Sequence, residues 1–173
     1  MRFFAPLAAA AIAVAACGGT AANASPSPTV ATTAPTASPS PTPSNAFKAE
    51  LKTSNEVPPI TDAEASCSGT GTLTLTGTTA KFDVAITGCP ATTAINIGHI
   101  HEGATGVNGA VKISTGLVAG DLTLTGGGVT FTRTATADAA LITAIMANPS
   151  GYYVNFHSTV HAGGVIRGQL SKA

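Results

Sequence analysis

Apolar and polar residues alternate with a period of two along much of the chain beyond residue 46. In the segment 152–157, for example, Val154 and Phe156 form an apolar face, while Asn155 and His157 lie on the opposite face. Successive side chains of a strand point to opposite sides, so this alternation predicts strands that bury one face. The predicted strands, separated mostly by short stretches rich in Gly, Pro, Asn and Ser, are 47–51, 69–76, 80–87, 94–101, 110–113, 121–124, 129–135, 152–157 and 165–170.

The spacing of these strands predicts the fold class. Short strands joined by glycine-containing turns, in a chain rich in Thr, Val and Ile, are typical of antiparallel β-proteins. We therefore expect an all-β domain over residues 47–171, an antiparallel immunoglobulin-like or Greek-key β-barrel or sandwich. This length supports one hydrophobic core and hence one domain.

One short helix is expected near the C-terminal strands. Apolar residues that include Ile142 and Ile145 recur at helical spacing between residues 139 and 147. Asp138 can cap the first turn, and the sequence Asn148-Pro149-Ser150-Gly151 stops the helix. Because its apolar face is narrow and it carries no basic residue, we expect this helix to close an open end of the barrel.

Charge is scarce and balanced, with eight Lys and Arg against eight Asp and Glu among 173 residues. Without a basic patch, the chain lacks the electrostatic signature of a protein that binds nucleic acid. We therefore expect no nucleic acid among its partners. No serine, cysteine or carboxylate pair lies in a recognisable nucleophile motif, so a hydrolase is not supported either.

The N-terminal residues indicate export. Residues 1–16 combine a positive charge at Arg2 with an apolar run at 5–13 that is too short to span a bilayer. The run leads into Val14-Ala15-Ala16-Cys17, which resembles a bacterial lipobox, in which the cysteine is lipidated and becomes the first mature residue. We expect a protein outside the cytoplasm, anchored to the membrane by lipid at Cys17; the alternative is an ordinary cleaved signal with a chance cysteine.

A linker is expected to follow Cys17 up to residue 46. It has no charge and no apolar periodicity, and it contains six of the eleven prolines of the chain. Such a segment cannot bury enough apolar surface to offset the entropy of ordering it. We expect an extended tether of up to about 3 Å per residue, with a glycosylated stalk as the alternative.

Cys67 and Cys89 remain once Cys17 is assigned to the lipid. In an exported protein, an even pair of cysteines is most simply a disulfide. Two thiolates on a metal are improbable, because neither cysteine has a neighbouring His or Cys. If the core-facing residues of the two flanking strands pair with one another, the residue numbers of each pair sum to an odd number. The numbers 67 and 89 sum to an even one. We therefore expect a bulge near Gly69 or Gly71, or divergence of the strands at their ends.

All four histidines of the chain lie in two short segments. His99 and His101 are two apart on a predicted strand and share a face, which is the outer one if Ile100 points inward. His157 also points outward, and His161 follows on a loop able to fold back over that surface. Neutral imidazoles suit Cu or Zn, so these four residues are candidate ligands of a metal ion.

Three polar residues are candidates to surround such a site. Glu102 and Asn155 lie where they can orient ring nitrogens, and Arg167 is predicted to point outward beside them. The alternative is a hydrogen-bonded set without metal, in which the imidazoles satisfy loop backbones and Glu102 pairs with Arg167 across strands. Both interpretations remain open at this point.

Several motifs resemble those of the CHRD domain, a repeat named for the developmental protein chordin and also found singly in bacterial secreted proteins. They occur in family order over nearly the whole span 47–170. The motifs are Phe47-Lys48-Ala49-Glu50-Leu51, Asn55-Glu56-Val57-Pro58-Pro59, Gly69-Thr70-Gly71, Gly98-His99-Ile100-His101-Glu102-Gly103, Asn108-Gly109, Gly151-Tyr152-Tyr153-Val154-Asn155-Phe156-His157 and Gly163-Gly164-Val165-Ile166-Arg167-Gly168-Gln169-Leu170.

The resemblance implies an immunoglobulin-like β-barrel with a distant similarity to copper-zinc superoxide dismutase, in a family whose biochemical function is largely unassigned. Dismutases need six histidines and an aspartate for two metals, so this chain implies at most a mononuclear site, with Arg167 suggested as an anion guide. Two departures appear in the last motif, where Ala162 replaces a usual proline and Val165 a usual glutamate. The second removes a carboxylate near Arg167.

Two hypotheses about function follow. The first is a lipid-anchored extracytoplasmic module that binds other proteins or surface polymers, with structural histidines and no catalysis. The alternative is a mononuclear copper- or zinc-binding module that uses the clustered histidines for storage, sensing or redox chemistry.

Overall fold

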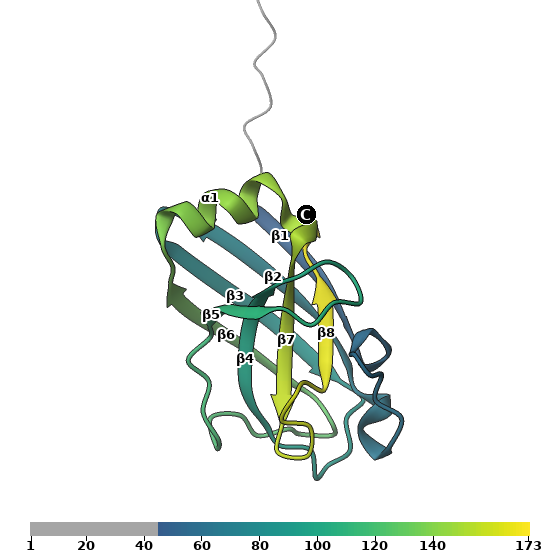
Figure 1. Ribbon diagram of the computed structural model, residues 1–173. Coiled ribbons are helices and arrows are strands. Elements are labelled where there is room, and N and C mark those ends of the chain that lie inside the picture. Colours follow the sequence, from purple (N-terminus) through teal and green to yellow (C-terminus); the bar gives the residue numbers. More distant parts are fainter. Residues whose placement is uncertain (1–44) are drawn as a thin grey trace, which may run out of the picture. The chain divides into compact units, whose positions relative to one another are not determined.

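The strands form one antiparallel sheet that curls into a nearly closed barrel (Figure 1). The computed structural model describes residues 45–173; the predicted signal segment, Cys17 and the predicted linker up to residue 44 lie outside the described residues. The strands are β1 (Ala46–Lys52), β2 (Ser68–Thr76), β3 (Thr79–Thr87), β4 (Ile95–Glu102), β5 (Ala110–Ser114), β6 (Val129–Thr136), β7 (Tyr152–Ser158), β8 (Ile166–Gln169) and β9 (Ser171–Lys172).

The order of the strands places distant parts of the chain side by side. Neighbours follow the sequence β5-β4-β7-β8-β1-β2-β3-β6, and the short β9 pairs with β1. β5 and β6 end this path and approach each other across the seam of the barrel. The all-β prediction is therefore confirmed, and the topology makes β4 the direct neighbour of β7.

The predicted alternation fills the interior of the barrel. Leu73 of β2 lies opposite Phe82 of β3, and both are almost completely buried. Apolar burial is the main favourable term in folding, at about 25 cal/mol per Å². The largest fully buried apolar side chains are Phe47, Leu51, Leu73, Leu75, Phe82, Ile86, Ile95, Ile100, Ile145, Phe156 and Ile166.

The predicted strand at 121–124 is wrong. This stretch forms no strand, and the chain beside it makes only an isolated bridge between Thr125 and Gly128. Its two leucines are only partly buried, and the glycines on either side, Gly120 and Gly126, have positive φ angles. Tight turns on both sides therefore leave too little chain to join the sheet. The strand β9 was not predicted, because a strand of two residues shows no alternation of apolar and polar positions.

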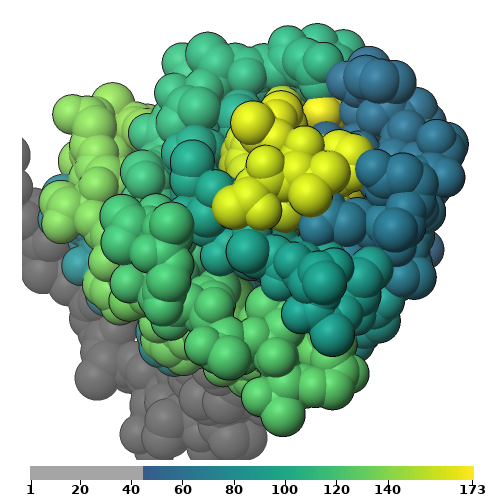
Figure 2. Space-filling view, turned by 90° about the horizontal axis from the view of Figure 1, so that it is seen from below, coloured from purple at the N-terminus to yellow at the C-terminus, as the bar shows by residue number. Residues whose placement is uncertain are grey.

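The ends of the barrel are covered differently. The helix α1 (Ala139–Ala147) crosses one end (Figure 1). The side chain of Asp138 accepts a hydrogen bond from the amide of Ala140 at its first turn, and Ile142 and Ile145 enter the core, as the sequence predicts. Loops cover the opposite end, where the loop after β7 (yellow) lies beside the segment after β1 (blue) (Figure 2). Among the described residues, no helix is long and apolar enough to cross a membrane.

The disulfide between Cys67 and Cys89 is confirmed. The pairing of β2 with β3 continues without a shift from Ser68 to Thr76, so the expected bulge is absent there. Both cysteines instead lie just outside the paired strands, so they do not have to follow the register of β2 and β3. This explains why their residue numbers sum to an even number. The bond fixes the 3-10 helix η2 (Ala63–Ser66), which precedes Cys67, against the end of the barrel.

Both faces of β7 are buried, which the alternation did not predict. The face that points away from the core is covered by loops, so that even its polar side chains Asn155 and His157 are buried. The covering segments are residues 53–66, with the 3-10 helices η1 (Thr53–Asn55) and η2, the loop 103–109 after β4 and the loop 159–164 after β7. A third 3-10 helix, η3 (Pro149–Gly151), leads from α1 into β7.

Gly98 of β4 leaves room for the side chains of Phe156 and Thr115. A Cβ atom at this position would lie 2.7 Å from Cδ1 of Phe156 and 3.0 Å from Oγ1 of Thr115. We expect Gly98→Ala to lower the free energy of unfolding by about 1–3 kcal/mol through overpacking. Gly71→Ala is the matched control, because a Cβ on this buried strand glycine meets nothing within 4 Å. Urea denaturation of both variants tests the prediction, and equal losses would contradict it.

Candidate metal centre

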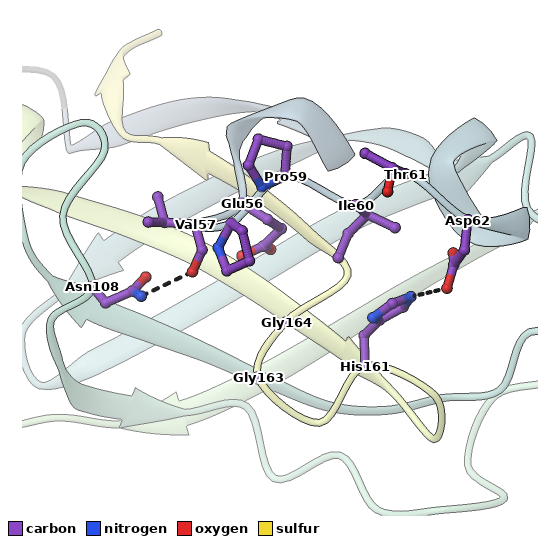
Figure 3. Close-up of a pocket in the computed structure, with 11 residues that line it drawn as sticks. Glu56, Val57, Pro59, Ile60, Thr61, Asp62, Asn108, His161, Gly163 and Gly164 are labelled. Atoms are coloured by element: carbon purple, nitrogen blue, oxygen red, sulfur yellow. Dashed lines mark hydrogen bonds and ion pairs between the residues drawn. The ribbon is translucent and has the colours of Figure 1, made fainter.

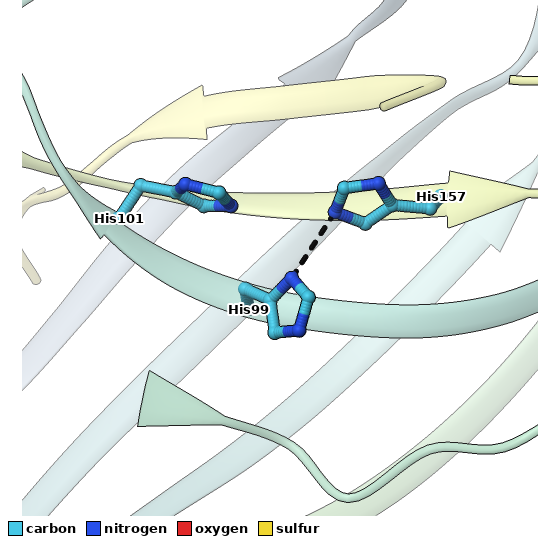
Figure 4. Close-up of side chains that lie close together, drawn as sticks. All are labelled: His99, His101 and His157. Carbon is cyan, nitrogen blue, oxygen red and sulfur yellow. Dashed lines mark hydrogen bonds between the residues drawn. The ribbon is translucent and has the colours of Figure 1, made fainter. Parts of the chain in front are cut away.

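Three of the four histidines come together on the outer side of the barrel wall. His99 and His101 lie on β4, and His157 lies on the neighbouring strand β7. In the antiparallel register, His99 is opposite Asn155 and His101 is opposite Tyr153. His157 is therefore the diagonal neighbour of His99. Figure 4 shows the three imidazole rings gathered at one point between the strands.

The spacing of the ring nitrogens fits one shared ion. One nitrogen of each histidine lies within 4.8 Å of the other two. The shortest separation that joins two rings, 3.2 Å, runs from Nδ1 of His99 to Nε2 of His157. Metal–nitrogen bonds of about 2.0–2.1 Å place two nitrogens of one ion about 3.3–3.5 Å apart. Small rotations of the rings would be enough to reach that spacing.

Backbone carbonyls fix which nitrogen of two rings carries the proton. Nδ1 of His157 lies 2.8 Å from the carbonyl oxygen of Ala162, and Nδ1 of His101 lies 2.9 Å from that of Gly109. A carbonyl oxygen can only accept, so in both rings Nδ1 is the protonated donor. The Nε2 lone pairs of both rings are thus available, and a donated Nδ1–H is the usual support of a metal-binding histidine.

The Nε2 atom of His101 has no hydrogen-bond partner among the described residues, although it is buried. An unpaired buried acceptor costs about 1–3 kcal/mol, so such atoms are rare in native proteins without a bound water or ion. The Nε2 atom of His157 accepts from Nδ1 of His99. An ion at this place would satisfy the His101 nitrogen and replace that hydrogen bond.

The environment favours the neutral forms of His99 and His157. Burial lowers the pKa of His99 to about 4, and the neighbouring His157 and His101 add to the effect. Burial also lowers the pKa of His157, although the hydrogen bond to Ala162 opposes it. Both rings are therefore neutral at pH 7, which is the state in which imidazole binds metals. His99 is only half-buried, so the cluster opens to solvent on its side.

His161 does not join the other three histidines. Its Nε2 atom lies 3.0 Å from Oδ2 of Asp62 and 3.6 Å from Oε2 of Glu64. The loop after β7 does fold back over the outer face, as expected, but it carries His161 towards the segment after β1. The structure therefore brings together three of the four candidate ligands.

The side chains expected to surround the site have other partners. Glu102 forms an ion pair with Lys112 at 2.7 Å. Arg167 is buried and pairs with Glu56 at 2.9 Å, so the alternative expectation of a pair between Glu102 and Arg167 is not met. Asn155 is buried beneath the loop after β7. Within the described part of the chain, the two carbonyls take the orienting role that was expected of side chains.

Tyr153 supports the cluster and was missed by sequence reasoning. Its ring stacks on His101 with centroids 4.9 Å apart and planes 4° from parallel. The guanidinium of Arg167 lies 4.5 Å from the centroid of the same ring, a distance typical of a cation–π contact. The Tyr153 hydroxyl accepts a hydrogen bond from the amide of Gly109. By the same alternation that places Asn155 and His157 outward, Tyr153 lies on their face of the strand, and this was the available signal.

The backbone around residue 109 leaves room only for glycine. A Cβ atom on this residue would overlap the carbonyl oxygen of Glu102, so only glycine lets the loop pass this close to β4. The same close approach brings the Gly109 carbonyl to His101. An Asn-Gly pair is a common turn signal, but the turn here lies at residues 105–106, and the sequence does not reveal which ring the Gly109 carbonyl meets.

The described domain matches one known family. A family model described as the CHRD domain matches residues 47–170. A comparison with curated proteins found no match. The matched residues span the strands from β2 to β8 and include all three histidines of the cluster.

Proposed function

The chain belongs to the CHRD domain family, and on that premise we propose that its domain is a binding module whose ligand is a single copper or zinc ion. Family membership suggests a binding or interaction role. Imidazole nitrogen is a good ligand for both metals, and no thiolate or acidic cluster competes in this set of three histidines.

The observation that carries the proposal is the unpaired Nε2 atom of His101. If the histidines served only to hold loops, one nitrogen of each ring would bind a carbonyl and the other would reach solvent or a donor. Two carbonyl contacts of this kind exist and favour that alternative. That alternative, however, leaves the buried Nε2 atom of His101 without a hydrogen-bond partner, at the point where two other ring nitrogens converge.

The residues of the chain have distinct roles in the proposed site. His101 and His157 would offer Nε2, held in place by the carbonyls behind them. His99 would offer Nδ1 after moving its proton to Nε2, which faces the more open side. Bound copper would supply a one-electron redox centre and bound zinc a Lewis acid. Three protein ligands leave a further position for an external ligand.

Calorimetric titration of the full chain with Zn(II) or Cu(II), after removal of metal with EDTA, tests this proposal. We expect one ion per chain with a dissociation constant below about 10 μM, or about −7 kcal/mol. His101→Ala should weaken binding at least about tenfold, because it removes one of three bonds to the ion.

His161→Ala is the matched control, since it removes an imidazole of the same domain that lies outside the cluster. Its affinity should equal that of the unaltered chain. Circular dichroism of each variant shows whether the fold is kept. Binding weaker than about 10 μM in the unaltered chain, or an equal loss in both variants, would refute the metal proposal.

We also propose that the module works outside the cytoplasm, held at a membrane by lipid on Cys17. The support is the sequence Val14-Ala15-Ala16-Cys17 after a short apolar run, and two or more acyl chains are enough for stable anchoring. A bacterial host fed with labelled palmitate should incorporate label into the unaltered chain and into none of the Cys17→Ser variant. Label in both proteins, or in neither, would argue against the anchor.

A further inference from the structure

A second concave site lies between the segment after β1 and the loop after β7. It is a pocket of about 330 Å³ on the covered end of the barrel (Figure 3). One wall consists of Val57, Pro58, Pro59 and Ile60, and Gly163 and Gly164 line the side formed by the loop. The volume is at the lower end of the range for small-molecule sites, which indicates a ligand of few atoms.

The pocket offers the carboxylates of Glu56 and Asp62 as acceptors, and two of its donors are used within the protein. Pro58 and Pro59 have no N–H group. The side-chain amide of Asn108 donates to the backbone carbonyl of Val57, and the backbone amide of Gly164 donates to the carbonyl of His161. These donors are already used, so a ligand that is itself a donor fits the wall better than an acceptor does.

One acceptor in the pocket is buried and without a partner. Glu56 lines the pocket and is only 4% exposed. Its Oε2 atom accepts a hydrogen bond from Nε of Arg167 at 3.0 Å and lies 2.9 Å from Nη2 of the same guanidinium. Its Oε1 atom has no hydrogen-bond partner among the described residues. Buried polar atoms of native proteins nearly always have a hydrogen-bond partner, so this oxygen is a candidate acceptor for a donor group of a ligand.

Gly164 brings the loop onto this carboxylate. Its φ angle is +131°, which favours glycine, and a Cβ atom there would lie 2.8 Å from Oε2 of Glu56. The carboxylate therefore lies directly against the backbone of the pocket.

The charges around the pocket favour a cation. The charge of Glu56 is offset by Arg167. At the other end, Asp62 and Glu64 both face the single imidazole of His161. Even with that imidazole protonated, two carboxylates meet one positive charge. Burial raises the pKa of Glu56 while Arg167 acts in the opposite direction, and a bound cation would add to the effect of Arg167.

We propose that this pocket binds a primary ammonium ion on a short aliphatic stem, with the ammonium group donating to Oε1 of Glu56 and the stem lying on the Pro58–Pro59 wall. Such a group occurs in free aliphatic amines and in the lysine side chain of a polypeptide. The site is separate from the histidine cluster, and it does not depend on metal binding.

Titration of the ¹⁵N-labelled full chain with butylammonium chloride tests the proposal. We expect saturable shifts of the Gly163 and Gly164 amide signals with a millimolar dissociation constant, as suits so small a ligand. The neutral analogue 1-butanol should bind at least about fivefold more weakly, because it lacks the charge. Added salt should weaken the butylammonium complex.

Asp62→Asn removes a pocket charge at an exposed position, so the fold should survive. We expect it to weaken butylammonium binding at least about threefold. Asp83→Asn is the matched control, since it removes an exposed carboxylate on β3 that pairs with Lys81 away from the pocket; its affinity should be unchanged. Equal binding of butanol, or equal affinity in Asp62→Asn and the unaltered chain, would overturn the proposal.

A comparison of probes identifies the source of the ammonium group. Tighter binding of Nα-acetyl-lysine methylamide than of butylammonium would assign the pocket to a lysine side chain of a polypeptide. Tighter binding of butylammonium or putrescine would assign it to a free amine. Absence of binding by all three would refute the ammonium site and leave the metal proposal unaffected.

Discussion

The buried ion pair between Arg167 and Glu56 is the interaction on which the loop-covered end of the molecule depends. It joins residues 111 apart in the sequence. Arg167 also donates to the side chain of Asn108 and lies over the ring of Tyr153, which in turn stacks on His101. Loss of one partner would leave an uncompensated buried charge, which costs about 3–5 kcal/mol in proteins. One guanidinium therefore supports both proposed sites, the histidine cluster through Tyr153 and the pocket through Glu56.

The barrel contributes a fixed register, and the loops contribute the chemistry. The pairing of β4 with β7 places His157 diagonally opposite His99, and this pairing is a property of the sheet. Loop backbones then set which ring nitrogens are free to bind a metal, because the carbonyls of Gly109 and Ala162 accept the Nδ1 protons of His101 and His157. The disulfide holds η2, which carries Glu64, in place at the same end of the domain. Rigid strands and pinned loops together make a preformed site.

Most of the strands, the helix and the outward direction of His99, His101 and His157 could be predicted, because they follow from side-chain periodicity within single segments. The partners of the loops could not. His161 was expected to join the cluster, yet it pairs with Asp62, which lies 99 residues earlier in the sequence. The partner of Arg167 was equally hidden, because Glu56 lies 111 residues away in the sequence, on the segment after β1. Contacts of this kind depend on topology, which no local pattern contains.

X-ray absorption at the zinc edge of the zinc-loaded full chain measures directly whether three imidazoles of this domain hold one ion. We expect three imidazole nitrogens at about 2.0–2.1 Å, with the outer-shell scattering of the rings and no sulfur. A spectrum with sulfur at about 2.3 Å, or with oxygen neighbours and no imidazole scattering, would contradict this expectation.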